Sequence, residues 1–149
     1  MLKPPYWLIM ITYRSPATVI VDAATGAVSR GPGPARAVAS SGDGGRVAVV
    51  GADQRTITIE DTATWLAGTA GAAASRLVPP EPAGVVTGLA LDGAGRSLAV
   101  VWTGPDLLPA VVVRYEADAG WRERGRITLP AGTARAAVTW VPASAGPPG

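Results

Sequence analysis

The sequence predicts an all-β, β-propeller-like chain of about three four-stranded antiparallel blades, and three observations support this prediction. A short segment at residues 34–39 recurs at 85–90 and at 133–138, a spacing of about fifty residues. A fixed period of this length, made of short strands, is typical of propeller blades. The 19 Gly and 14 Pro residues supply many turns, and the apolar residues are mostly Val, Ala, Leu and Ile. Such a composition favours strands over long helices.

The predicted strands follow one another along the whole chain, because short β-branched or aliphatic runs alternate with Gly, Pro, Asp and Ser. At 149 residues the chain fits a single domain. It divides into repeat units at about 1–33, 34–83 and 84–133, followed by a terminal strand, Ala134 to Val141, within 134–142. The strands of these units are expected at 7–13, 17–22, 27–30, 36–40, 46–51, 56–61, 75–79, 85–91, 97–103, 110–115 and 124–129.

Two kinds of local signal place the turns. Asp43 with Gly44, and Asp92 with Gly93, fall between consecutive strands, and the Asp-Gly dipeptide is typical of hairpin turns that need a positive φ. The Ala-rich stretch 65–77 is the best helix candidate. Its two glycines each cost about 1 kcal/mol relative to alanine in a helix. We therefore expect a loop there, with at most one helical turn.

The repeats can be phased by naming the strands of a blade a to d, from the inner to the outer edge. The chain then reads b-c-d, a-b-c-d twice, and a final a, the strand from Ala134 to Val141. Closed propellers typically have four to eight blades, and an open sheet edge invites pairing with another chain. The chain is therefore expected to be a partial propeller or half of an oligomeric one. In the second case the terminal strand completes the first unit of another copy. A two-sheet β-sandwich is the alternative fold, because its short strands and turns look similar.

Parts of the pattern A-x-S-x-D-G-x-R-[VL]-A-V-V, followed by a polar turn, by a β run that ends in Asp and by T-G, are distributed over the three units. In this pattern the chain resembles a divergent bacterial WD-repeat or related β-propeller, and the resemblance covers nearly the whole chain. The residues that carry it are Ser40, Asp43, Gly44, Val47, Ala48 and Asp61 in one unit, Asp92, Gly93, Leu98 and Ala99 in the next, and Asp22, Thr25 and Gly26 at the end of the first. The Gly-His and Trp-Asp dipeptides of WD repeats are absent, so the hydrogen-bond network that His supports in that family is not expected.

The composition excludes several classes of function. The chain has no His and no Cys, so Ser-His-Asp and Cys-His catalysis, zinc sites and disulfides are excluded. No catalytic residue, metal or cofactor is expected, and the chain is not expected to be an enzyme. Its 13 basic residues are scattered and the net charge is only +2, which disfavours nucleic-acid binding. The apolar run from Tyr6 to Ile11 is far shorter than the ~20 residues that cross a membrane. A cytoplasmic location is compatible with the lack of cysteine.

The turns between strands b and c are the candidate recognition surface. Loops on a rigid scaffold commonly carry function, and these turns mix aromatic residues, Arg and Asp, as recognition surfaces do. The sequence thus favours a non-catalytic binding module or scaffold that presents loops to a protein partner. The candidate binding residues in these turns are Tyr13, Arg14, Asp53, Arg55, Trp102 and Asp106.

Two tryptophans give an alternative function. Trp65 and Trp121 follow strand c in successive units. If these rings are exposed, they could stack on sugars, and the chain would be a carbohydrate-binding propeller lectin. The other interpretation is that they pack between blades, because Trp buries a large apolar area.

Overall fold

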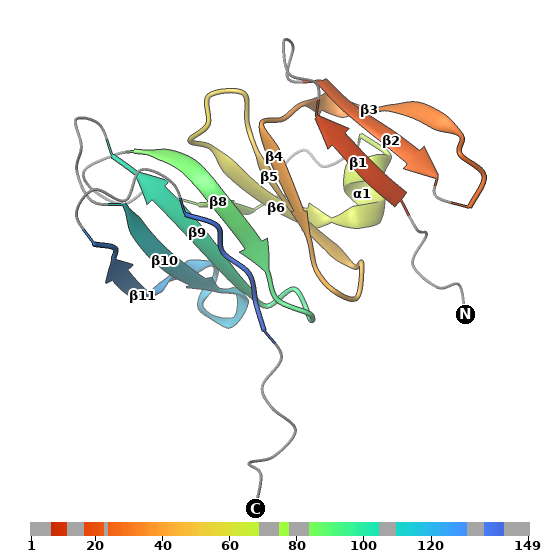
Figure 1. Cartoon of the computed structure of the whole chain (residues 1–149). Helices are drawn as coiled ribbons and strands as arrows, with labels where there is room; N and C mark the ends of the chain where they lie inside the picture. The colour runs from red at the N-terminus through yellow and green to blue at the C-terminus, as the bar shows by residue number, and fades with distance from the viewer. Residues whose placement is uncertain are drawn as a thin grey trace, which may run out of the picture.

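The computed structural model describes residues 7–11, 17–22, 24–68, 75–77, 84–104, 110–130 and 136–141. In this part of the chain three antiparallel sheets follow one another, and each is a meander in which consecutive strands pair. Figure 1 shows the sheets as a row, from the first sheet (red to orange) to the third (green to blue). The all-β, blade-like prediction is therefore confirmed.

The strands keep the predicted phase. The first sheet has the order β1-β2-β3, the second β4-β5-β6-β7 and the third β8-β9-β10-β11. The second and third sheets are thus complete a-b-c-d units, and the first is b-c-d. The strands are β1 (Trp7–Ile11), β2 (Ala17–Asp22), β3 (Val28–Pro34), β4 (Ala37–Ser40), β5 (Arg46–Val50), β6 (Ile57–Asp61), β7 (Ser75–Leu77), β8 (Val85–Leu91), β9 (Ser97–Thr103), β10 (Val111–Glu116) and β11 (Arg122–Thr128).

Short helical turns connect strands c and d in the two complete sheets. The helix α1 (Thr62–Leu66) follows β6 directly, and the 3-10 turn η2 (Ala117–Ala119) follows β10. The single helical turn was expected in 65–77, but it begins at Thr62 and ends before Gly68, which has a φ of 70°. A left-handed glycine ends a helix without steric cost.

The hairpin turns differ from the prediction in one respect. Gly44 has a positive φ of 75°, as expected, but in the third sheet the positive φ of 72° lies at Gly95 and not at Gly93. The hydrogen bonds that close the turns explain this difference, because Ser41 N donates to Arg46 O and Asp92 N donates to Ser97 O. Gly95 therefore occupies the place of Gly44, and the two Asp-Gly dipeptides are not structurally equivalent.

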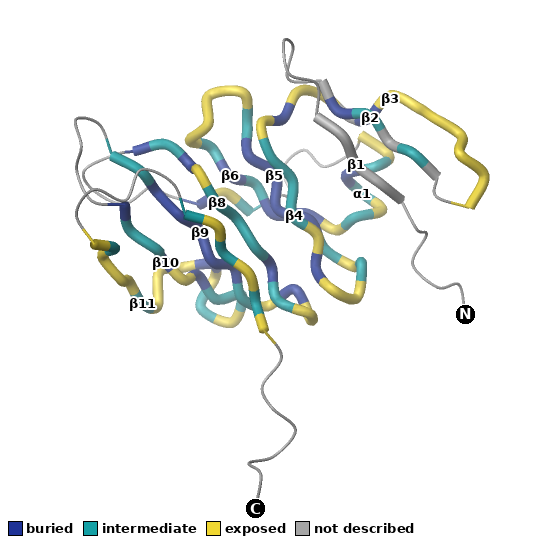
Figure 2. The backbone as a smooth tube through the Cα atoms, in the orientation of Figure 1, coloured by how far each residue is buried: buried dark blue, intermediate teal, exposed yellow. Residues whose placement is uncertain are grey.

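Both faces of the second sheet are covered, as stacked blades require. The larger core lies between the second and third sheets, where Ile57, Leu98 and Val100 are fully buried. The smaller cluster is formed on the opposite side of β5 by Val47 and Val49 with Trp65 of α1 and Ala35, which follows β3. Figure 2 shows buried positions along the strands of the second and third sheets. Two covered faces do not fit the two-sheet sandwich, in which each sheet packs on one face only.

The terminal strand was predicted wrongly in one respect. Residues 136–141 pair with no strand in the described part of the chain, and 134–135 lie outside the described residues. A ladder needs a neighbouring strand, and no described segment lies beside 136–141 in that role. The segment still lies against the third sheet, because Trp140 Nε1 donates a hydrogen bond of 2.9 Å to Ala90 O of β8.

Candidate functional site

The b–c turn of the second sheet, Gly51 to Thr56, is held by the carboxylate of Asp53. Oδ1 of Asp53 accepts hydrogen bonds from the backbone N–H groups of Arg55 and Thr56, both at 2.9 Å, and Oδ2 accepts one of 2.6 Å from Thr56 Oγ1. Gly51 N also donates to Thr56 O at 2.8 Å. An Asp side chain that bonds its own following backbone stabilises a turn in this way. The turn is thus fixed although it is exposed to solvent.

These hydrogen bonds lower the pKa of Asp53 to about 2, with the Thr56 hydroxyl as the largest contributor. Hydrogen bonds to a carboxylate favour its charged form. The negative charge of Asp53 is therefore present at neutral pH and is directed into the turn.

Neighbouring segments join this turn at the same end of the sheets. Arg36, between β3 and β4, donates from Nε to Ala52 O at 3.4 Å, and Val86 N of β8 donates to Gln54 O at 2.8 Å. Gln54 has a φ of 60°, an uncommon value for a residue other than glycine. The Thr87 and Thr103 hydroxyls lie 2.8 Å apart. We call Arg36, Gln54, Arg55, Thr87 and Thr103 the b–c face.

Of the predicted binding residues, Arg55 belongs to the b–c face and Asp53 holds the turn that carries it, and both are exposed. Tyr13, Arg14 and Asp106 lie outside the described residues. Arg36 and the two threonines were not predicted, because they reach the surface from the d–a connection and from strand ends. The phased repeat offered a signal, since it places the d–a connections beside the b–c turns.

The three tryptophans among the candidate binding residues are buried, so the structure agrees with the interpretation that Trp65 and Trp121 pack between blades and not with the alternative of exposed rings. Trp102 is 2% exposed and donates from Nε1 to Tyr115 Oη at 3.2 Å inside the core, and Trp65 and Trp121 are 4% and 9% exposed. Both residues after strand c pack inward: Trp65 lies in the cluster with Val47 and Trp121 in the larger core. Their large rings remove apolar area from water at the blade boundaries. They offer no open ring face for stacking on a sugar.

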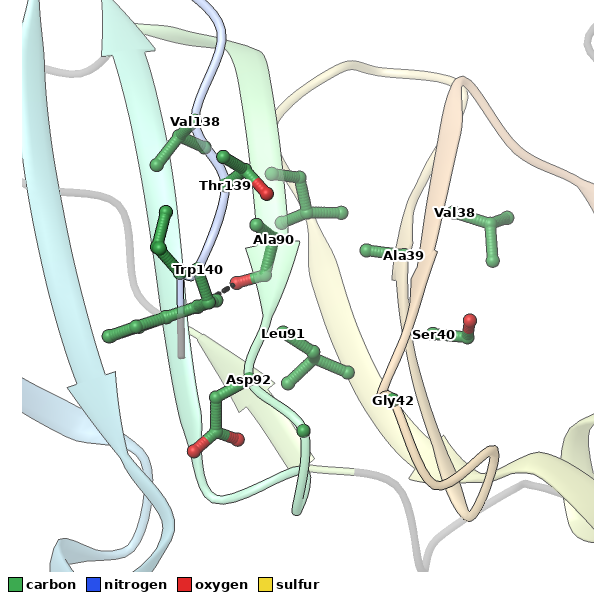
Figure 3. Close-up of a pocket in the computed structure, with 13 residues that line it drawn as sticks. Val38, Ala39, Ser40, Gly42, Ala90, Leu91, Asp92, Val138, Thr139 and Trp140 are labelled. Carbon is green, nitrogen blue, oxygen red and sulfur yellow. Dashed lines mark hydrogen bonds between the residues drawn. The ribbon is translucent and has the colours of Figure 1, made fainter. Parts of the chain in front are cut away.

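The strands β4 and β8 and the terminal segment border an open cavity of about 740 Å³, which we call the axial cavity. Its walls come from β4, from β8 and from residues 138–141, and Figure 3 shows Ser40, Ala90 and Thr139 among the lining residues. The lining carboxylate, Asp92, accepts hydrogen bonds from Arg96 N at 2.8 Å and Ser97 N at 3.1 Å, so it serves the β8–β9 turn. The phased repeat already placed these segments at equivalent positions, so the sequence contained the signal for this cavity.

The described ranges of the chain contain no group of three or more acidic side chains that could hold a metal ion. They also contain no helix that is long and apolar enough to cross a membrane.

Solved structures share this arrangement of sheets. The crystal structure of Hsv2 from Kluyvelomyces marxianus matches with a TM-score of 0.56 and 14% identity, over 91% of this chain and 46% of that chain. The β-propeller domain of the Trilobed protease from Pyrococcus furiosus matches with a TM-score of 0.53 and 14% identity, over 83% of this chain and 38% of that chain. This chain thus spans less than half the length of either. The likeness shows the fold alone: the chain has a β-propeller fold.

Sequence comparisons add no assignment. No protein-family model matches the chain, and no curated protein matches it.

Replacing Asp53 with alanine is expected to lower the free energy of unfolding by about 1 kcal/mol, because the backbone donors of Arg55 and Thr56 lose their acceptor. Since the pKa of Asp53 falls from 3.8 in the unfolded chain to about 2, its contribution is complete above pH 3.8. It is lost as the pH falls through about 2. Urea unfolding of both proteins at pH 7 and at pH 2 measures this difference. An equal stability gap at pH 7 and at pH 2 would show that the carboxylate charge has no role.

Proposed function

We propose that the chain is a non-catalytic binding module in which the b–c face recognises an acidic segment of a protein partner. The observation that carries this proposal is the fixed turn of the second sheet, which displays Arg55 from a scaffold joined to the next sheet through Gln54 O and Val86 N. A preorganised surface loses little conformational freedom on binding.

The charges of the b–c face favour an acidic partner. Arg36 and Arg55 are exposed, and within the described ranges neither guanidinium takes part in a salt bridge. The carboxylate nearest to them in sequence, Asp53, is occupied by hydrogen bonds within its own turn. Guanidinium groups bind carboxylates with two parallel hydrogen bonds. The threonine hydroxyls add neutral donors and acceptors at the rim.

The test uses a library of random displayed peptides selected on the purified chain, followed by titration of the best peptide. We expect selected peptides to be rich in Asp and Glu, and Arg55→Ala to weaken their binding about tenfold or more, as arginines at interface centres do. Arg36→Ala should act in the same direction. Binding should also weaken as salt is raised, because exposed charges are screened.

Arg124→Ala is the matched control, since Arg124 is an exposed arginine of β11, outside the b–c face. It should leave the affinity unchanged. If selection returns no peptides, or if all three variants bind a selected peptide equally well, the b–c face is not the recognition surface.

A further inference from the structure

In the described part of the chain, the first sheet has one strand fewer than the other two sheets, and the terminal segment is paired with no strand. In the described part of the chain the first sheet has three strands, whereas the second and third have four. Among the described residues, no strand occupies the strand-a position beside β1. An unpaired strand edge exposes backbone donors and acceptors and is a template for pairing.

The terminal segment 136–141 lies where strand a of a following sheet would lie. It contacts the third sheet through Trp140 Nε1 and Ala90 O, and Ala136 O would be 2.9 Å from a Cβ added at Gly88 of β8. It also lines the axial cavity beside β4 and β8, which are both strands a. Figure 1 shows this segment in blue running along the third sheet. The segment therefore lies in the position of a strand a, but no described strand pairs with it as strand b.

Exposure along this segment alternates as in a half-covered strand. Ala137, Thr139 and Val141 are exposed, and the residues between them are partly buried. Val141 is 78% exposed, although a β-branched residue of an inner strand would normally be covered. A period of two with one face covered is typical of an extended strand on a sheet.

We propose that residues 136–141 of one copy pair with β1 of a second copy and supply the missing strand a of its first sheet. Because each copy offers one unpaired strand a and one sheet that lacks it, the exchange is reciprocal and gives a closed two-fold dimer. Two copies of the three described sheets make six blades, within the usual range of four to eight. Charged residues on the outer β11 edge, such as Arg122, Glu123 and Arg124, disfavour pairing there.

The described sheets predict the register of this exchange. In them, strand a pairs with strand b as Val38 opposite Val49 and Leu89 opposite Val100. The lining of the axial cavity includes 38–40, 89–91 and 138–140, so Val138 lies at the place of Val38 and Leu89, one residue beyond the position that the sequence repeat alone gives. The residue of β1 that is equivalent to Val49 can be identified from the residue that lies opposite it on strand c.

Each strand c ends in an acidic residue, and the third residue before it marks the same position in every sheet. This residue is Val19 in β2 and Thr58 in β6, which lie opposite Met10 and Val49. Met10 is therefore the equivalent of Val49. In the dimer, Val138 of one copy should lie opposite Met10 of the other.

The chain has no cysteine, so a pair of introduced cysteines reports this contact directly. Cross-strand partners have Cα atoms about 4.5–5.5 Å apart, within the range for a disulfide. We expect Met10→Cys with Val138→Cys to give a covalent dimer on oxidation. Ile9→Cys with Val138→Cys is the matched control, because a shift of one residue moves a side chain to the opposite face of the strand. It should not cross-link.

Light scattering of the unmodified chain gives the first result, with twice the 15.0 kDa of one chain expected. Val141→Asp should shift the chain to monomers, because the dimer covers this exposed valine. Ile127→Asp, at a residue of β11 that is 66% exposed, should remain dimeric. A monomeric unmodified chain overturns the proposal, as does a disulfide within one chain or equal cross-linking of both cysteine pairs. These outcomes do not bear on peptide binding at the b–c face.

Discussion

Trp121→Ala is expected to lower the free energy of unfolding by about 3–5 kcal/mol, the range for removing a large aromatic side chain from a core. Trp121 is 9% exposed and lies in the core between the second and third sheets. Its ring also lies 5.7 Å from the guanidinium carbon of Arg46 in the second sheet. Removing the ring would leave a cavity at this boundary, so the loss exceeds the transfer free energy of the indole alone.

The backbone conformation of Trp121 allows the contribution of side-chain packing to be measured separately from that of backbone strain. Its φ is 60°, a left-handed conformation that costs a non-glycine residue roughly 1–2 kcal/mol. Alanine keeps this cost and glycine removes it. Trp121→Gly should therefore be about 1 kcal/mol more stable than Trp121→Ala, although it has lost the same ring.

Two further variants complete the measurement. Arg46→Ala should cost about 1 kcal/mol, since it removes the cation–π contact and the 2.8 Å hydrogen bond from Nη1 to Gly95 O. Ile127→Ala, at an exposed site, should change stability by less than about 0.5 kcal/mol. Urea unfolding at one protein concentration gives all four values, because association would make stability depend on concentration. A loss for Trp121→Ala as small as that for Ile127→Ala would contradict the packing role.

Strand positions could be predicted from the sequence because they depend on local pattern. The expected ranges 17–22, 85–91 and 97–103 coincide with β2, β8 and β9. Each is an aliphatic run with clear polar or glycine boundaries, so a period of two and the flanking turns suffice to locate it. The a-b-c-d phase was predictable for the same reason, since equivalent runs recur at equivalent spacing.

Side-chain directions after the strands could not be predicted in this way. Trp65 and Trp121 follow strand c in a pattern that fits both an exposed and a buried ring. Which way each ring points depends on the connecting turn, such as α1 for Trp65 and the left-handed residues Gly120 and Trp121 in the third sheet. These conformations decide whether the ring meets the neighbouring sheet, and the sequence pattern does not show them.

Contacts between sheets could not be predicted from local sequence patterns either. The turn at Asp53 was predicted as a recognition element, but its hydrogen bond from Val86 and its contact with Arg36 join segments that are distant in sequence. The terminal segment shows the same limit, because its strand state depends on whether a strand b lies beside it.

The carboxyl group of Glu60 gives the second large prediction, since it is buried without compensation. Glu60 lies on β6 opposite Val47 and is 9% exposed. Cross-strand partners share a face of the sheet, and Val47 belongs to the apolar cluster with Trp65. Within the described structure Oε1 of Glu60 has no hydrogen-bond partner. Burial therefore raises the pKa of Glu60 above its usual value of 4.5.

A raised pKa means that the folded chain binds the proton of Glu60 more tightly than the unfolded chain does. The favourable contribution of the protonated group is complete below pH 4.5, and it is lost as the pH rises through the higher pKa of the folded state. At pH 7 the ionised group should destabilise the fold, and an unsatisfied buried polar group costs about 1–3 kcal/mol. Glu60→Gln removes the charge and keeps the shape, so we expect this variant to be more stable than the unmodified chain at pH 7 and no more stable than it at pH 4.

Glu123→Gln is the matched control, because Glu123 is exposed and forms a 2.6 Å ion pair with Arg126. Exposed ion pairs contribute about 0–1 kcal/mol, so this variant should be slightly destabilised at neutral pH. Urea unfolding of the two variants and the unmodified chain between pH 4 and pH 8 isolates the titration of Glu60 as the difference between curves. A loss of stability in Glu60→Gln at pH 7 would mean that the carboxylate is held by a cationic partner, and the second sheet would then depend on an ion pair where the structure places an isolated acid.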